Sequence, residues 1–241
     1  MRRLTKKSKG RSTLTQPSLK QFTRRLARPS DTRYTFEKQT RFSPVLTTIT
    51  SSQHLPPGSD FPSEAGGNRL VLNEAIHDAI FEELIPSAES FIWIATADIK
   101  DLHLAYGSRR KYETFLRLFD DLIESGIEIR LIHAKEPGPR FRADFDRFPN
   151  LVKSDRFERM LCPRNHMKAV IVDGRSAFLG SANLTGAGMG AKSASRRNFE
   201  CGIISHEPEL VTGLMDAFDE LFMGAHCGRC DRRDICPDPV A

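Results

Sequence analysis

Two short apolar runs joined by an Asp-Gly pair constrain the fold of this chain more than any other feature. The first run is Met-Lys-Ala-Val-Ile-Val over 167–172, Asp173 and Gly174 follow it, and a second run covers 177–180. Apolar runs of this length between turn residues predict buried strands, and a tight Asp-Gly connection predicts that they pair as a hairpin. The hairpin would return the residues after the second strand to the end where the first strand begins.

Four polar residues of different chemistry are expected at that end. His166 and Lys168 stand two positions apart, so they share a face of the first strand, and Ser181 and Asn183 follow the second. Lys168 supplies positive charge, and Ser181 and Asn183 supply hydrogen-bond donors for the non-bridging oxygens of a phosphodiester. An imidazole such as that of His166 can attack phosphorus or move a proton near neutral pH.

Taken singly, these residues have plainer structural interpretations. A histidine beside a strand is usually structural, and a lysine is usually part of a solvated face. The joint pattern is H-x-K-x4-D-x6-G-S-x-N, and Asn198-Phe199-Glu200 follows it. Such a set of spacings is hard to reach by chance, and it favours a phosphodiesterase site.

The pattern resembles the HKD signature of the phospholipase D superfamily, including the downstream Gly180-Ser181-x-Asn183. The resemblance covers residues from about 70 to 223, and its strongest part is 165–200. It implies an α/β fold in which helices flank a mixed β-sheet. With one complete motif copy, the chain is similar to the single-motif branch, which includes bacterial endonucleases and mitochondrial cardiolipin-hydrolase-like proteins. Those proteins act as homodimers.

The resemblance also implies residue roles. His166 of one subunit would be the nucleophile and form a phosphohistidine, and the second copy of His166 would protonate the leaving oxygen. Lys168 and Asn183 would hold phosphoryl oxygens with support from Ser181, and Glu200 would orient the histidine. No metal or other cofactor is expected for catalysis.

The remaining positions of the motif and the residues just after it are assigned supporting roles. Asp173, the third letter of the signature, and Gly180 are expected to be structural. Arg196 and Arg197 follow the signature close to where a phosphate would lie, so substrate binding is predicted for them.

A second H-x-K occurs at His133-Ala134-Lys135. Five residues after Lys135 stands Arg140, not an aspartate, and no Gly-Ser-x-Asn follows, so we interpret this pair as a decoy for catalysis. Sites in α/β sheets gather at the carboxyl ends of strands, where this pair is expected. Lys135, Arg140 and Arg142 could therefore line a substrate entrance, although a surface connection is the plainer interpretation.

The rest of the folded part alternates between helical and extended patterns, which predicts a mixed α/β sheet. The predicted elements are helices over 70–85, 112–123 and 210–222, and strands over 91–96, 127–132, 151–153, 157–161 and 201–205.

Charge divides the chain into a basic segment and a near-neutral body. Residues 1–68 hold 13 basic and four acidic residues, a net charge of +9, whereas the remainder carries −4 and the whole chain +5. We expect this segment to be disordered and to contact polyanions, with nucleic acid favoured and anionic phospholipid as the alternative. No apolar run reaches the length of a transmembrane helix and no secretory signal is present, so a cytoplasmic protein is expected. The composition also fits an organelle transit peptide.

Three of the five cysteines form a C-x2-C-x5-C pattern near the end of the chain: Cys227, Cys230 and Cys236. Three thiolates suit a structural zinc ion or iron–sulfur cluster, which usually takes a fourth ligand. Cys162 is the first candidate for it and His226 the second. A reduced tail or an opportunistic disulfide are the alternatives. Cys201 lies in a strand pattern and is predicted to be core.

Charge, element pattern and cysteine content together predict three regions. They are a tail over 1–68, a catalytic domain over 69–223 and a Cys-rich segment over 224–241.

Three functions remain open at this point. A nuclease is favoured by the basic tail and by Arg196 and Arg197. A phospholipase D-type lipid hydrolase or phosphatidyl transferase is the alternative, disfavoured because no membrane-docking apolar helix is recognised. A non-catalytic nucleic-acid-binding module is the third, and the intact His166, Lys168 and Asn183 argue against it.

Overall fold

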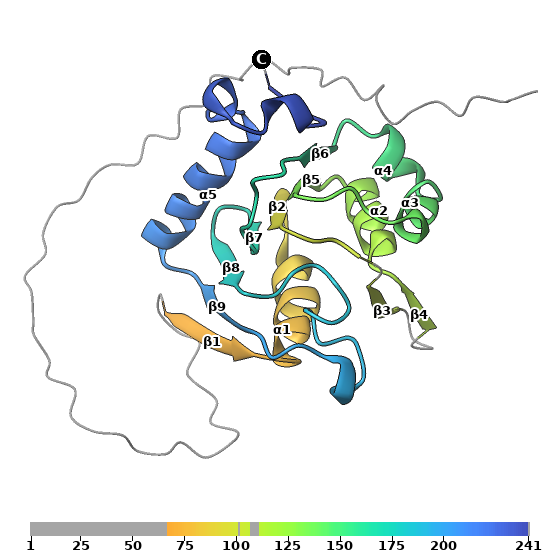
Figure 1. Cartoon of the computed structure of the whole chain (residues 1–241). Helices are drawn as coiled ribbons and strands as arrows, with labels where there is room; N and C mark the ends of the chain where they lie inside the picture. The colour runs from red at the N-terminus through yellow and green to blue at the C-terminus, as the bar shows by residue number, and fades with distance from the viewer. Residues whose placement is uncertain (1–66, 101, 107–110, 241) are drawn as a thin grey trace, which may run out of the picture. The chain divides into compact units, whose positions relative to one another are not determined.

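A seven-stranded mixed sheet forms the centre of the computed structural model, which describes residues 67–100, 102–106 and 111–240 (Figure 1). The strand order is β1-β9-β8-β7-β2-β5-β6. The pairs β2–β5 and β5–β6 are parallel and the others antiparallel, which confirms the predicted mixed sheet. The strands are β1 (Asn68–Leu72), β2 (Phe91–Thr96), β5 (Glu128–His133), β6 (Phe157–Leu161), β7 (Ala169–Val172), β8 (Ser176–Gly180) and β9 (Cys201–Ser205). The predicted disordered tail lies almost wholly outside the described residues.

Helices cover both faces of this sheet, so a hydrophobic core lies on each face. Alternate residues of β7 point into the two cores. Val170 and Val172 pack in one core with the first helical segment and α2, whereas Ile171 packs with α5 in the other. A small β3–β4 hairpin lies beside the sheet (Figure 1). The elements are α1 (Ala75–Asp78), its π-helical continuation η2 (Ala79–Leu84), α2 (Leu116–Glu124), α3 (Pro139–Phe145), α4 (Pro149–Lys153), α5 (Pro208–Phe222), β3 (His103–Tyr106) and β4 (Lys111–Thr114).

Three predicted elements are wrong in type or extent. The helix predicted over 70–85 starts only at Ala75, because the residues before it pair with β9 as an edge strand. Residues 151–153 belong to α4, not to a strand; Pro149 suits a first helical turn, and the N–H of Asn150 donates to Asp120 Oδ1 at 2.9 Å. The helix predicted from 112 starts at Leu116, because the residues before it pair with β3.

The β7–β8 hairpin is confirmed, and Asp173 forms its turn. Asp173 and Gly174 both adopt positive φ, at 53° and 66°. The Asp173 carboxylate accepts hydrogen bonds of 2.8–2.9 Å from the N–H groups of Glu89, Ser90 and Phe91, and from Arg175. Burial acts to raise the pKa of this carboxyl, but these donors together hold it below its ordinary value. The carboxylate thus hydrogen-bonds the turn to the start of β2. This turn follows β7, whereas Lys168 precedes it, so Asp173 lies at the other end of the strand from Lys168.

Helix α5 covers only part of its sheet face. Ala177 packs against α5, but Leu179, two residues on and so on the same face, is 36% exposed. Its register partner on β9 is Ile203, which pairs in turn with Leu70 on β1, 64% exposed. We call Leu70, Leu72, Leu179 and Ile203 the apolar strip. Cys201 lies on this face and is exposed, so the prediction that it belongs to the core is wrong.

Candidate active site

His166 and Lys168 lie in the segment that leads into β7, and their side chains touch. Lys168 Nζ is 3.0 Å from His166 Nδ1 and 3.2 Å from Nε2, and it donates to the His166 carbonyl at 2.8 Å. The N–H of Gly180 donates to the Lys168 carbonyl at 3.1 Å, so the second strand returns to this point as predicted. Lys168 is buried while His166 is exposed. Burial lowers the pKa of Lys168, and the charge of Glu200 opposes that effect.

The buried side chain of Asn165 fixes this segment to the sheet. Its Nδ2 donates to the carbonyl groups of Thr96 at 2.9 Å and Ile132 at 3.2 Å, the first on β2 and the second on β5. Its Oδ1 accepts from the N–H of Met167 at 3.0 Å. The residue before His166 therefore ties the histidine to the carboxyl ends of two parallel strands.

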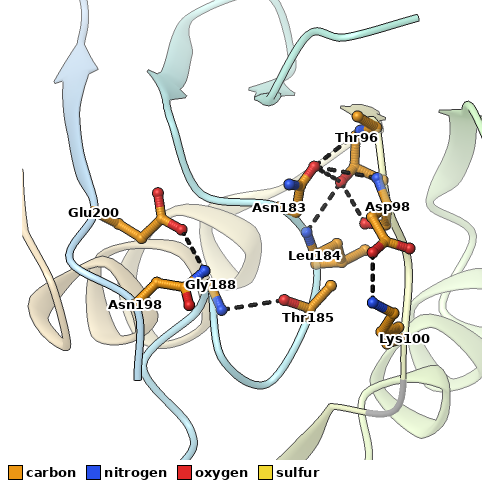
Figure 2. Close-up of polar contacts among 10 residues, drawn as sticks. Thr96, Asp98, Lys100, Asn183, Leu184, Thr185, Gly188, Asn198 and Glu200 are labelled. Atoms are coloured by element: carbon orange, nitrogen blue, oxygen red, sulfur yellow. Dashed lines mark hydrogen bonds and ion pairs between the residues drawn. The ribbon is translucent and has the colours of Figure 1, made fainter. Parts of the chain in front are cut away.

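Asn183 is held by the loop that follows β2, as Figure 2 shows. Its Oδ1 accepts from the N–H groups of Ala97 and Asp98 at 3.1 Å each, and Thr96 Oγ1 lies 3.4 Å away. The N–H of Leu184 donates to Thr96 Oγ1 at 3.0 Å. Among the described residues, all hydrogen bonds to the Asn183 side chain end on its carbonyl oxygen Oδ1. These bonds orient the side chain, and its NH2 group remains available to donate to a ligand.

Ser181 and Glu200 are joined directly. The Ser181 hydroxyl donates to Glu200 Oε2, and it accepts from the N–H of Cys201 at 3.1 Å. Asn198 Nδ2 donates to the other carboxylate oxygen of Glu200 at 2.9 Å (Figure 2). Among the described residues Glu200 forms no hydrogen bond with His166, so its predicted role in orienting that ring stays a prediction.

Gly180 has a steric reason to be glycine. A Cβ at this position would lie 2.6 Å from the Cys201 carbonyl oxygen and from a ring carbon of Phe178. Any larger residue would force β8 away from β9 just before Ser181. The residue thus supports the site through the backbone.

The two predicted substrate-binding arginines already have protein partners. Arg196 ends a short 3-10 turn, is exposed, and its Nε donates to Ser193 Oγ at 3.2 Å. Arg197 lies 3.5 Å from Glu74 Oε2 in a partly exposed ion pair. Contacts of this kind at a surface are weak, so a phosphate could displace them, and substrate binding stays a prediction.

The second H-x-K is enclosed. His133 is fully buried, its Nδ1 lies 2.7 Å from the Lys135 carbonyl oxygen, and its Nε2 has no hydrogen-bond partner among the described residues. No phosphate can reach this ring, which agrees with its interpretation as a decoy. Arg140 and Arg142 lie on α3, and their predicted place at a substrate entrance stays a prediction.

Sequence reasoning missed Thr96 and Asn165 as positioning residues. The signal for Thr96 was its place as a polar residue at the end of the buried strand β2, where α/β sheets gather their sites. Asn165 stands directly before the signature histidine, but its partners lie 33 and 69 residues away and local spacing cannot reveal them. The four predicted metal ligands, the cysteines at 162, 227, 230 and 236, lie together outside this cluster and are described below.

Residues 81–222 match the family model described as "Cardiolipin synthase, PLD-like domain". The match covers more than half of the chain, which therefore belongs to this phospholipase D-like family. No helix among the described residues combines the length and the hydropathy needed to cross a membrane.

The chain also resembles individual proteins and solved structures. The human 5'-3' exonuclease PLD3 is 28% identical over 144 residues, which cover 55% of this chain and 27% of the relative, and the Pongo abelii protein of that name matches equally. The chain thus spans about a quarter of the length of these relatives. NucT from Helicobacter pylori has a TM-score of 0.48 at 17% identity, covering 66% of this chain and 96% of NucT. Nuc from Salmonella typhimurium has a TM-score of 0.47 at 14% identity, covering 65% and 93%.

Proposed function

We propose that this protein is a phosphodiesterase that hydrolyses nucleic acid at the site of His166, Lys168 and Asn183. The observation that carries the proposal is the contact between Lys168 Nζ and the His166 ring, at 3.0 Å, on a segment fixed by Asn165. A buried ammonium group beside an exposed imidazole provides charge and a nucleophile at one surface point. The amide NH2 of Asn183 adds a donor for phosphoryl oxygens, whereas the Ser181 hydroxyl donates to Glu200 and supports the site from there.

In this proposal a nitrogen of His166 attacks phosphorus, and the bond from phosphorus to the leaving oxygen breaks. The leaving oxygen takes a proton from the partner's His166. Water then attacks the phosphohistidine, the P–N bond breaks, and the partner's His166 takes a proton from that water, which restores both histidines. Lys168 and Asn183 neutralise the charge that grows on the non-bridging oxygens. No step of this mechanism requires a metal ion or another cofactor.

The second histidine of this mechanism comes from a second copy of the chain. Three observations support a homodimer: one complete motif per chain, the exposed position of His166, and the apolar strip beside the site. Ser181 directly follows β8 and Glu200 directly precedes β9, so two strands of the strip end at the site. Twofold assembly is also the commonest symmetry of soluble oligomers.

Nucleic acid is the substrate that we favour. A curated relative is named an exonuclease, and the basic segment 1–68, with a net charge of +9, suits a polyanion. The family description, which names cardiolipin synthase, keeps lipid phosphodiesters as the alternative. We propose the cytoplasm as the protein's location, because the C-x2-C-x5-C spacing suits a cytosolic metal site better than a secreted disulfide scaffold.

The test is hydrolysis of labelled single- and double-stranded DNA and RNA in excess EDTA. We expect cleavage by the wild type and a loss of at least about a thousandfold in His166→Ala, since removing a nucleophile has effects of this order. His206→Ala, which changes an exposed histidine outside the site, is the matched control and should cleave normally.

Other outcomes assign the alternatives. Headgroup release from phosphatidylcholine or cardiolipin vesicles, with no nucleic-acid cleavage, would make the protein a lipid phosphodiesterase. Tight nucleic-acid binding with neither reaction would make it a binding module. Cleavage that requires added magnesium, or that survives in His166→Ala, would contradict the proposed site.

A further inference from the structure

Four of the five cysteines line one small pocket between β6 and the C-terminal segment. Three of them, Cys227, Cys230 and Cys236, come from that segment, and the fourth is Cys162, which directly follows β6. Cys162 and Cys227 are separated by 65 positions in the sequence, so their meeting is a property of the fold. None of the four forms a disulfide, and Cys201, the remaining cysteine, does not line the pocket.

The C-terminal segment over 224–240 folds without a hydrophobic core of its own. It contains two single turns of 3-10 helix, Cys227–Arg229 and Arg233–Ile235, neither of which buries a residue. Ile235, a large apolar residue of this segment, is 74% exposed. Segments that bury so little apolar surface usually depend on a disulfide or a bound metal ion for their structure.

Polar contacts place this segment against the end of β6. Asp238 Oδ2 accepts from the N–H of Leu161 at 2.8 Å, and Arg232 donates to the Pro163 carbonyl at 2.9 Å. Cys236 Sγ lies 3.8 Å from the Leu161 carbonyl oxygen. These contacts place the three segment cysteines beside Cys162.

The pocket provides four sulfur donors for a cation. Metal coordination deprotonates thiols outright, so a bound cation would hold these sulfur atoms as thiolates. In the described residues no three of these sulfur atoms lie within 4.8 Å of one another, whereas tetrahedral zinc places them about 3.8 Å apart. Binding a single ion would therefore draw the segment closer to β6.

We propose that Cys162, Cys227, Cys230 and Cys236 bind a structural metal centre through four thiolates, either one zinc ion or one iron–sulfur cluster. Both centres are held by sets of four cysteines. Because Cys162 stands four residues before His166, the centre would pin the C-terminal segment beside the strand that leads to the active-site histidine. It is a structural site, separate from the hydrolytic one, and it stands whether or not the proposed function is correct.

The test is metal analysis of the full chain purified without chelators and, in parallel, without oxygen. We expect about one zinc per chain with no visible absorption, or iron with acid-labile sulfide and a visible charge-transfer band. Cys227→Ser and Cys230→Ser should each lower the metal content and expose the remaining thiols to alkylation, while Cys201→Ser should match the wild type. These two changes lie in the partly exposed C-terminal segment, so folding of the sheet should survive them.

Cys162→Ser tests the fourth ligand. It should lose the metal as the other variants do, and cobalt added to the apo wild type, but not to this variant, should give the absorption of a four-thiolate site. Metal-free protein that fails to bind added zinc, cobalt or iron and sulfide would overturn the proposal. So would a native disulfide among the four cysteines, or full metal content in Cys227→Ser and Cys230→Ser.

Discussion

At the scale of single residues, the same H-x-K pair has opposite properties at its two positions. His166 is exposed with the ammonium of Lys168 beside it, whereas His133 is fully buried. Burial, followed by the nearby charge of Arg159, lowers the pKa of His133 to about 4. Position 133 therefore keeps a neutral ring inside the sheet, and the surroundings of each pair decide whether it can meet a phosphate.

His133 should make the stability of the protein depend on pH. Its pKa is 6.5 when unperturbed and about 4 in the folded chain. The unfolded chain therefore binds a proton first, so stability is present above pH 6.5 and is lost as the pH falls towards 4. The loss between pH 7 and pH 5 should be about 2 kcal/mol in the free energy of unfolding, because one pKa unit corresponds to about 1.4 kcal/mol.

Urea unfolding at both pH values, for the wild type and His133→Asn, measures this effect. The variant starts less stable, and it should lose about 2 kcal/mol less than the wild type on acidification. Equal losses in the two proteins would mean that His133 does not titrate in this way.

At the scale of elements, the extent to which α5 covers the sheet determines which apolar surface remains exposed for dimerisation. The helix covers one end of its sheet face, and β1, β9 and the end of β8 leave the apolar strip exposed. Burying such a strip against its own copy would stabilise a dimer by roughly 25 cal/mol for each Å² of apolar surface removed from water. In the proposed dimer, burial of the strip would bring the second His166 to the site.

Polar substitutions in the strip should separate the two copies. We expect Leu70→Ser with Leu179→Ser to raise the dimer dissociation constant at least about tenfold, because buried apolar anchors dominate interfaces. Sedimentation velocity over a range of concentrations measures this constant, and activity per chain should fall with it. Tyr112→Ser, which changes a 71% exposed residue on β4, is the control. A wild type that is monomeric yet active, or an unchanged dimer in the double variant, would contradict the role of the strip.

The sequence predicted the parts of this structure that are local. The β7–β8 hairpin, the Asp173 turn and the return of Gly180 to Lys168 follow from one contiguous pattern. The edge strand β1 could not be predicted, because its partner lies more than 100 residues away and its own residues also fit a helix. Asn183 was predicted as a site residue, but its anchoring was not, because its carbonyl oxygen accepts from the distant loop after β2.

At the scale of the whole molecule, charge is divided unevenly along the chain. Residues from 69 onward carry a net charge of −4, so attraction of the proposed nucleic-acid substrate would depend on the basic segment before them and on local cations such as Lys168. In the proposed mechanism the imidazole of His166 would then act on phosphorus. The proposed mechanism depends on a covalent bond between phosphorus and a ring nitrogen of His166.

The most direct measurement is a trap of that bond. Protein is mixed with an oligonucleotide labelled at its phosphates, quenched in base within the first turnover, and digested for mass spectrometry. We predict an acid-labile, base-stable phosphoramidate on His166, absent in His166→Asn. An active protein that forms no adduct, or that carries the phosphoryl group on another residue, would contradict the mechanism.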